Sequence, residues 1–328
     1  MMDARYLLLK LKWWVREHAF LRSGLLTGET ELSYELPEAY GDWAVHPCVR
    51  FIADGIGGRR WWMVLSPYPH IDSSRENILL YCGEEKGDGL PPRRWTFVRE
   101  VCGTHPEGYN SDPGLFYDSA SRELWVTWRE WGTENVPDGC PYCCTMRVRT
   151  GDGVNFSGAE VIALNENADA GLCADTQMCP IVYSWRGETV LYGVSYVYEP
   201  YLLPRGMSLY RFAGGRFRLS ESVPWADRSF DLWHFDLFEH EAALYQIVTG
   251  QSGNAIMIGR STDGLHFSYS RRPLHSHRLF LRRNYFYKAT AVVHGGMLHV
   301  FYPRKSGRDS VRIVMRSMPV CRLDKYFK

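Results

Sequence analysis

The sequence lacks the features that mark several large classes of protein. No apolar run reaches the roughly 20 residues that a membrane-spanning helix needs. The 38 basic residues nearly balance the 37 acidic ones, and the net charge of +1 gives no general attraction to nucleic acid or anionic lipid, so binding of either would need a local patch. A phosphate-binding glycine loop, a dinucleotide fingerprint, a serine nucleophile elbow and an HExxH motif are missing from the sequence. We therefore expect no membrane span, no nucleic-acid partner, no cofactor and no metal.

The N-terminal residues and the cysteines argue against a secreted, disulfide-rich protein. Residues 1–20 contain Leu7, Leu8 and Leu9, but lysines follow and no small-residue cleavage site is present. The nine cysteines are an odd number in a chain long enough to build a full core, so a disulfide framework is not indicated. We expect a cytoplasmic protein, while export from a longer precursor stays open.

One cysteine pair has the spacing of a redox or zinc motif. Cys140 and Cys143 are separated by Pro-Tyr, and Cys144 follows directly. Redox motifs of this kind act at the start of a helix after a strand, whereas this pair follows a loop sequence, and a zinc site would need a second pair. We expect a cluster of reduced thiols.

The chain is instead rich in aromatic residues, and these belong to a repeat. It holds 12 Trp, 20 Tyr and 15 Phe. A pattern of an apolar strand, a turn and an aromatic-rich strand that ends in polar residues begins near residues 46, 112, 179, 233 and 287. The repeats recur about every 55 to 67 residues, which is long enough for four strands and their loops.

This period predicts an all-β fold, a five-bladed β-propeller that forms one domain over residues 1–328. Residues 1–40 would supply the strand that closes the last blade and leaves no long edge unpaired. Leu9, Leu11 and Trp13 alternate with lysines, which favours a strand near the N-terminus, although the same basic and apolar residues would suit an interfacial helix.

The propeller geometry predicts where a functional site lies. The first strand of a blade starts, and the second strand ends, on the same face of the propeller. Polar residues at these points should therefore gather around the axis, beside aromatic rings that suit the faces of a sugar. The candidate catalytic residues are His46, Asp112, Asp175, Glu199 and Asp236. The candidate substrate-binding residues are Tyr68, Trp128, Arg129, Tyr198, His234, Lys288 and Arg304.

Two motifs resemble known carbohydrate-active families. The NSDPGLFYD segment at residues 110–118 and the STDGLHF turn at residues 261–267 resemble five-bladed propeller glycosidases, notably glycoside hydrolase family 43. The resemblance implies three acids that open the first three blades: a base, an Asp that adjusts the acid, and a general acid. Asp112 matches the second of these. The first blade has His46-Pro47 where the family has Asp-Pro, and the third has Met178-Cys179-Pro180 where the family has Glu-Gly-Pro.

Residues 258–274 are also similar to the mannoside phosphorylases, which use one acid and hold phosphate with basic side chains. On that resemblance His46, Arg129, Arg304 and Lys305 would be phosphate ligands. The Ser-x-Asp-Gly-x-x-Phe turn also has a structural explanation, in which Asp263 bonds backbone amides and Phe267 packs between strands.

We predict a divergent carbohydrate-active protein, with a glycoside hydrolase as the first hypothesis. Hydrolysis of a glycosidic bond needs two carboxyl groups, here Asp112 and one of Asp175, Glu199 or Asp236. A glycan-binding propeller without catalysis and a phosphorylase are the alternatives. The cations Arg129, Lys288, Arg304 and Lys305 would favour an anionic ligand, unless neighbouring acids neutralise them inside the protein.

Overall fold

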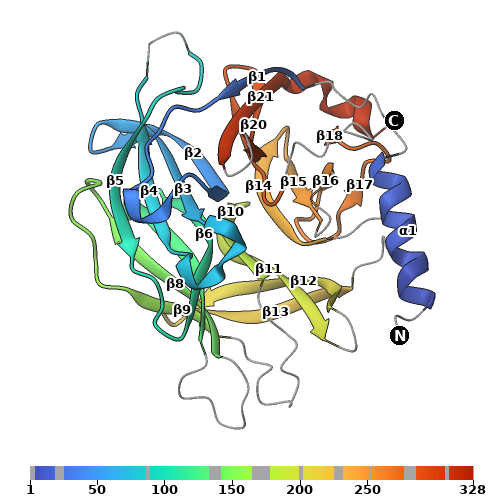
Figure 1. The fold of residues 1–328 in the computed structure, drawn as a ribbon, viewed down its shortest axis with the longest axis horizontal. Helices are drawn as coiled ribbons and strands as arrows, with labels where there is room; N and C mark the ends of the chain where they lie inside the picture. Colours follow the sequence, from blue (N-terminus) through green and yellow to red (C-terminus); the bar gives the residue numbers. More distant parts are fainter. Residues whose placement is uncertain are drawn as a thin grey trace.

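The computed structural model describes residues 4–18, 26–85, 89–132, 142–164, 178–198, 202–224, 232–250, 253, 255–276, 286–306 and 310–327. Within these residues the strands form five antiparallel sheets around a common centre, as Figure 1 shows. The fold is the five-bladed β-propeller that the repeat predicts.

The blades follow one another along the chain. The first blade is β2 (Ala44–Ile56), β3 (Arg59–Pro67), β4 (Ile78–Gly83) and β5 (Trp95–Cys102). The second is β6 (Gly108–Asp118), β7 (Glu123–Gly132), β8 (Tyr142–Thr150) and β9 (Glu160–Leu164). The third is β10 (Met178–Trp185), β11 (Glu188–Tyr198), β12 (Leu202–Ala213) and β13 (Arg216–Pro224).

The fourth blade is β14 (His234–His240), β15 (Ala243–Thr249), β16 (Ala255–Ser261) and β17 (Ser268–Tyr269), and β18 (His275–Ser276) also pairs with β16. The fifth is β19 (Thr290–His294), β20 (Met297–Lys305), β21 (Val311–Pro319) and β1 (Thr27–Glu31). Short 3₁₀ helices are η1 (Glu38–Tyr40), η2 (Pro69–Ile71), η3 (Ser73–Arg75) and η6 (Val320–Tyr326).

The innermost strands β2, β6, β10, β14 and β19 contact one another in succession, and β19 contacts β2 again. The hydrophobic core lies between the blades rather than inside any one of them. Trp62 of the first blade packs with Val126 of the second, and Tyr192 of the third packs with Phe235 of the fourth. This ring of inter-blade cores holds the innermost strands around the axis.

The N-terminal segment closes the fifth blade, as the sequence predicts. β1 runs antiparallel to β21, the third strand of that blade. Glu29 of β1 accepts a hydrogen bond from Tyr302 of β20 at 2.9 Å and pairs with Arg316 of β21 at 3.2 Å. The sheet is therefore held by side chains as well as by its backbone ladder.

The strand expected near residue 10 is wrong. Residues Ala4–His18 form the helix α1. Leu9, Leu11 and Trp13 alternate with lysines over a few residues only, whereas Leu7, Leu11 and Trp14 follow the helical spacing across the whole segment. The segment also contains no glycine or proline, so nothing in it opposes a helix.

The Asp-Gly turns have the structural role that the sequence allowed for them. Asp263 accepts hydrogen bonds from the backbone N–H groups of Leu265 and His266 at 2.9 and 2.8 Å. Asp152 does the same for Val154 and Asn155 at 2.8 and 2.7 Å. These motifs connect the third and fourth strands of two blades and need no catalytic explanation.

Candidate active site at the propeller axis

A backbone irregularity repeated in three blades positions the centre of the candidate site. His46, Asp112 and Cys179 each precede a proline, and they have φ angles of 53°, 52° and 53°. Positive φ is uncommon for residues other than glycine. At the same points β2, β6 and β10 shift register against their neighbours. The three X-Pro bulges bring these residues together at the axis.

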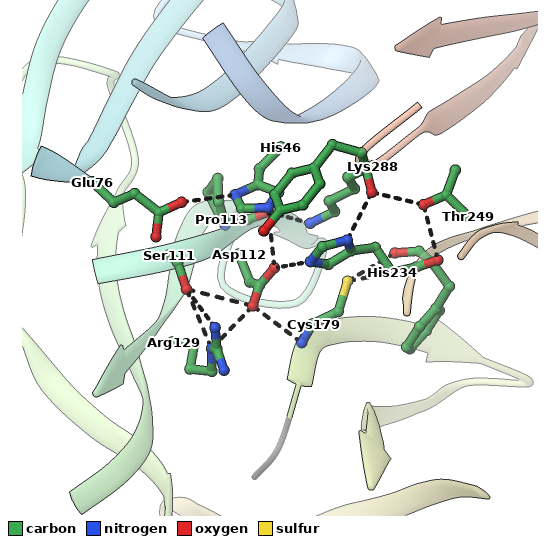
Figure 2. Close-up of polar contacts among 12 residues, drawn as sticks. His46, Glu76, Ser111, Asp112, Pro113, Arg129, Cys179, His234, Thr249 and Lys288 are labelled. Atoms are coloured by element: carbon green, nitrogen blue, oxygen red, sulfur yellow. Dashed lines mark hydrogen bonds and ion pairs between the residues drawn. The ribbon is translucent and has the colours of Figure 1, made fainter. Parts of the chain in front are cut away.

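Asp112 is the central residue of this group and is completely buried (Figure 2). Its Oδ2 atom lies 3.0 Å from Arg129 Nε and 3.4 Å from the backbone nitrogen of Cys179, which donates to it. Its Oδ1 atom lies 3.1 Å from His234 Nε2 and 3.8 Å from His46 Nε2. Burial opposes the charge of Asp112, but Arg129 and the histidines outweigh it and hold the pKa of this carboxyl well below its usual range.

His234 lies between two acceptors, the backbone carbonyl of Tyr287 and the carboxylate of Asp112. Its Nδ1 lies 2.7 Å from the backbone carbonyl of Tyr287, which can only accept a hydrogen bond, so Nδ1 carries the hydrogen. Burial lowers the pKa of His234, and Asp112 opposes this by its charge and by a hydrogen bond with the ring. A neutral ring with its hydrogen on Nδ1 would turn the Nε2 lone pair toward Asp112 Oδ1, an arrangement that favours a proton or a cation between the two atoms.

His46 is buried, and its ring nitrogens have no hydrogen-bond partner in the described part of the chain. Nε2 faces Asp112, and Nδ1 lies 3.7 Å from Glu76 Oε1. Burial lowers the pKa of His46 well below its ordinary value, so the ring is neutral. The Tyr287 ring stacks on it with the centroids 4.7 Å apart.

His46, Asp112 and His234 could hold a metal ion. One ligand atom from each lies within 4.8 Å of the other two, and all three residues are buried. Two imidazole nitrogens and one carboxylate oxygen suit a divalent transition metal. The outer contacts fit as well: His234 donates to the Tyr287 carbonyl, and His46 faces a carboxylate, as metal-binding histidines commonly do.

Glu76 belongs to the same cluster and was not among the residues predicted from the sequence. It is almost fully buried just before β4. Burial, with a smaller effect from Asp112, raises the pKa of this carboxyl well above its ordinary value. The predicted site residues stand at first-strand starts and second-strand ends, but the third strand of a blade also begins on this face. An acidic residue two positions before a third strand was the available signal.

The candidate cations have partners inside the protein. Arg129 pairs with Asp112 and donates to Ser111 Oγ at 2.9 Å. Lys288 is fully buried and donates to the carbonyl of Pro113 at 2.8 Å. Arg304 reaches outward across the fifth blade to Glu29 and Glu31 of β1. Arg304 thus belongs to the closure of that blade, and Asp112 neutralises Arg129, whereas the contact of Lys288 is to an uncharged carbonyl.

Asp236 is buried near the axis but is held by Arg50. Two nitrogens of the Arg50 guanidinium, Nη2 and Nη1, donate to the two Asp236 carboxylate oxygens at 2.6 and 2.8 Å, and the Thr290 hydroxyl also donates to this carboxylate. Burial raises the pKa of Asp236, but Arg50 outweighs burial and the net pKa is lowered. Because Arg50 also donates to the Leu115 carbonyl, the pair ties strands of several blades together, and a structural role accounts for Asp236.

Half-buried aromatic rings lead outward from the buried centre. Tyr68 stacks on Tyr287 with centroids 5.8 Å apart, and Tyr287 stacks on His46. On another side Arg129 lies over the Tyr109 ring at 5.3 Å, and Trp131 stacks on Tyr109 at 5.1 Å. Trp128, expected to bind substrate, is instead packed in the core between the first two blades.

The structure thus brings His46, Asp112, Arg129, His234 and Lys288 together, with Glu76 added; we call these six residues the axial cluster. Asp175 and Glu199 lie outside the described residues. Tyr198 is the last residue of β11. Of the cysteine motif, Cys140 lies outside the described residues, and Cys143 and Cys144 are buried free thiols in β8.

A surface cavity of about 550 Å³ lies elsewhere, on the outer side of the fourth blade. It is lined by Arg260, Ser261, Thr262, His266, Ser268, Tyr269, Arg271, Tyr326 and Phe327. These residues include no carboxylate and no member of the axial cluster. The chemistry of the axial cluster therefore decides where we place the candidate site.

Comparisons with known proteins give the fold independent support. No family model matches the chain, and no curated protein matches it by sequence. Among solved structures, an N-acetylgalactosamine deacetylase from F. plautii in complex with blood group B trisaccharide is similar with a TM-score of 0.67 and 14% identity, over 90% of this chain and 96% of that one.

Two glycoside hydrolases are similar as well. A GH43_1 enzyme from Xanthomonas citri gives a TM-score of 0.59 at 11% identity and covers 92% of each chain. Zg3597, a family 117 glycoside hydrolase from Zobellia galactanivorans, gives 0.55 at 11% identity over 88% of this chain and 89% of that one. At these identities the likeness shows a shared five-bladed propeller fold.

Proposed function

We propose that this protein is a carbohydrate-active hydrolase that reacts at the axial cluster and binds a divalent metal ion through His46, Asp112 and His234. One observation carries the proposal: two histidine nitrogens and one carboxylate oxygen converge in a buried centre. Among the described residues, neither ring nitrogen of His46 has a hydrogen-bond partner there. Buried polar atoms without partners are costly unless something else binds them.

The residues around the three ligands support such a centre. Arg129 and the Cys179 N–H hold Asp112 Oδ2, which leaves Oδ1 directed at the histidines. The Tyr287 carbonyl fixes the ring of His234. Three protein ligands leave positions open for water and substrate, and a bound metal supplies Lewis acidity and a more acidic water.

The aromatic rings beside the centre favour a sugar substrate. Tyr68, Tyr287, Tyr109 and Trp131 are half-buried and flank the polar cluster, a combination suited to a sugar ring. The similar deacetylase is named with a bound trisaccharide. We infer removal of an acyl group from a sugar. Water adds to the acyl carbon, the C–N or C–O bond breaks, and the leaving amine or alcohol takes the proton, which gives a carboxylate product.

A second candidate is glycoside hydrolysis. Two carboxyl groups, Asp112 and Glu76, lie against opposite nitrogens of His46, and cleavage of a glycosidic bond requires such a pair. Asp175 and Glu199 remain proposed partners of Asp112. The similar glycoside hydrolases favour this reaction, which needs no metal at the three ligands.

The test is a panel of acetylated sugars and oligosaccharides, assayed for acetate release and for reducing-sugar release, with and without inorganic phosphate. The protein is first treated with a chelator and then returned to Zn²⁺, Mn²⁺ or Ca²⁺ one at a time. Metal content is measured for the wild type and for H46A and H234A. H299N is the matched control, because His299 is a buried histidine of β20 outside the cluster.

We expect about one metal ion per chain in the wild type and H299N, none retained by H46A or H234A, and acetate release that depends on the metal. Reducing-sugar release that survives the chelator would favour glycoside hydrolysis instead, and release that requires phosphate would favour phosphorolysis. Glycan binding without any product would make the protein a binding propeller. Absence of metal binding under every condition would overturn the metal centre.

A further inference from the structure

The helix α1 exposes an unusual concentration of apolar side chains. Among the described residues, eleven large hydrophobic side chains are exposed, and five of them lie in this one helix. They are Leu7, Leu8, Leu11, Trp14 and Val15, which are 46 to 55% exposed. Figure 1 draws α1 at the rim of the molecule, outside the ring of blades.

These five side chains form one continuous stripe. Their positions follow the spacing i, i+1, i+4, i+7 and i+8, which covers about 120° of the helix surface at 100° per residue. Trp13 and Glu17 lie on the opposite side of the helix and are both 3% exposed. The helix therefore packs on the protein through its Trp13 side and presents the stripe to the outside.

Positive charge accompanies the stripe. The helix contains Arg5, Lys10, Lys12 and Arg16 against a single acidic residue, Glu17, which is on the packed side. By helical spacing, Lys10 and Lys12 flank the stripe; Lys12 is exposed, whereas Lys10 is half-buried with its ammonium over the Trp13 ring at 5.0 Å. The chain as a whole has a net charge of +1. The local patch that the overall charge could conceal is thus in α1.

We propose that α1 anchors the protein to an anionic lipid surface, with the stripe inserted among the lipid headgroups and acyl chains. An apolar face with tryptophan and leucine, bordered by lysines, is the pattern of helices that lie in the membrane interface. In the described residues no helix is long and apolar enough to cross a membrane, so the attachment is peripheral. The excess of basic residues in the helix, with Lys12 exposed beside the stripe, favours anionic lipid over an apolar groove of a partner protein. This proposal does not depend on the proposed enzymatic function.

The test is flotation of the full chain with vesicles of phosphatidylcholine alone or of phosphatidylcholine mixed with phosphatidylglycerol. The variants are a double change, L7S with L11S, and the charge change K12Q. The matched control is I71S, because Ile71 is 60% exposed and lies in η2, outside the helix. All of these residues are exposed, so the fold should persist, and thermal unfolding checks this.

We expect binding to the anionic vesicles that weakens at high salt, falls by about tenfold or more in the double variant and several-fold in K12Q, and is unchanged in I71S. Equal binding by wild type and double variant would overturn the proposal, and so would absence of binding to anionic vesicles. Sedimentation velocity tests the other possible occupant of the stripe, a second copy of the chain. A wild-type dimer that the double variant converts to monomer would show that the stripe binds a second copy of the chain.

Discussion

The Asp112 carboxylate receives contacts from four blades. Arg129 comes from its own blade, His46 from the first, the Cys179 N–H from the third and His234 from the fourth. A buried charge with this many partners is stable only while its main counter-charge remains, because a carboxylate in a dry interior pays a large desolvation cost. Arg129 is that counter-charge.

We predict that R129M lowers the free energy of unfolding by about 3 to 5 kcal/mol and abolishes activity at the axial cluster, since Asp112 is left buried without its cation. R211M is the control. Arg211 forms ion pairs with Glu188 and Glu221, but all three side chains are more than 40% exposed. Its replacement should cost less than about 1 kcal/mol. Chemical unfolding measures both, and equal losses would contradict the central role of Arg129.

His299 provides a pH-dependent prediction away from the cluster. It is buried in β20, its Nδ1 lies 2.8 Å from Ser317 Oγ, and burial lowers the pKa of the ring to about 4. The unfolded chain takes up the proton near pH 6.5, while the folded chain does so only near pH 4. The stability supplied by the neutral ring is therefore complete above about pH 6.5 and is lost as the pH falls toward 4.

From the protonation of His299 we expect the free energy of unfolding to fall by about 2 kcal/mol between pH 7 and pH 5. H299N should show a correspondingly smaller fall over the same interval. Urea unfolding at the two pH values gives the comparison, and the difference between the two proteins cancels the contributions of His46 and His234. An equal fall in the free energy of unfolding for wild type and H299N would rule the effect out.

The turns between the third and fourth strands depend on one glycine each. Gly153 has a φ of 73°, and a Cβ atom there would lie 2.5 Å from Cη2 of Trp62 in the preceding blade. Gly151, in the same turn, does not have a positive φ, and a Cβ atom there would meet no other atom within 4 Å. The two glycines therefore form a matched pair.

G153A should lower the free energy of unfolding by about 2 kcal/mol or more, from backbone strain and from displacement of Trp62. G151A should change it by less than about 0.5 kcal/mol. Thermal or urea unfolding distinguishes them. A neutral G153A would mean that the close contact between this turn and the first blade is unimportant.

The strands of the blades were predictable from the sequence because their pattern is strong and repeated, whereas the helix α1 was not, because its pattern is ambiguous. The aromatic strands and their turns repeat often enough to give the blades and the closing strand. In α1 two periods coexist, and the alternation at Lys10 and Lys12 obscured the helical one. Among the site residues, His46, Asp112 and His234 stand at strand starts, which the repeat locates.

Other features of the site depend on contacts that one sequence does not contain. Arg50 neutralises Asp236 from 186 positions away, and Arg304 turns outward because β1 places Glu29 and Glu31 beside it. Trp128 follows the same alternation as its neighbours but faces the core between blades. Which face of a strand meets which neighbour is decided by the packing of blades, not by local pattern.

The whole molecule relies on the pairing of β1 with β21. Leu26 and Leu32, on either side of β1, are buried in different inter-blade cores. Removal of residues 1–32 should therefore lower the free energy of unfolding by about 3 to 6 kcal/mol for the two leucines. It should also cause association that depends on concentration, because β21 becomes an open edge.

Removal of residues 1–18 is the control, because it deletes α1 and keeps β1. This shorter deletion should leave the protein monomeric, and it should lose only the stability supplied by the packed Trp13 side of α1, a loss that the longer deletion shares. Calorimetry and sedimentation velocity give the two readings. If the longer deletion is as stable and as monomeric as the shorter one, closure by β1 is dispensable.

The same pairing has a consequence for how the chain folds during its synthesis. The hydroxyl of Thr27 donates to the carbonyl of Ser317, 290 positions further on. The ribosome therefore makes β1 before any blade and must make every blade before β1 finds its partner. Contacts between such distant residues form slowly, although the entropy of closing the loop grows only slowly with its length. Until β21 emerges, the first four blades can form in order, but the ring stays open, and a nascent chain at this stage exposes the edge through which it could join another copy.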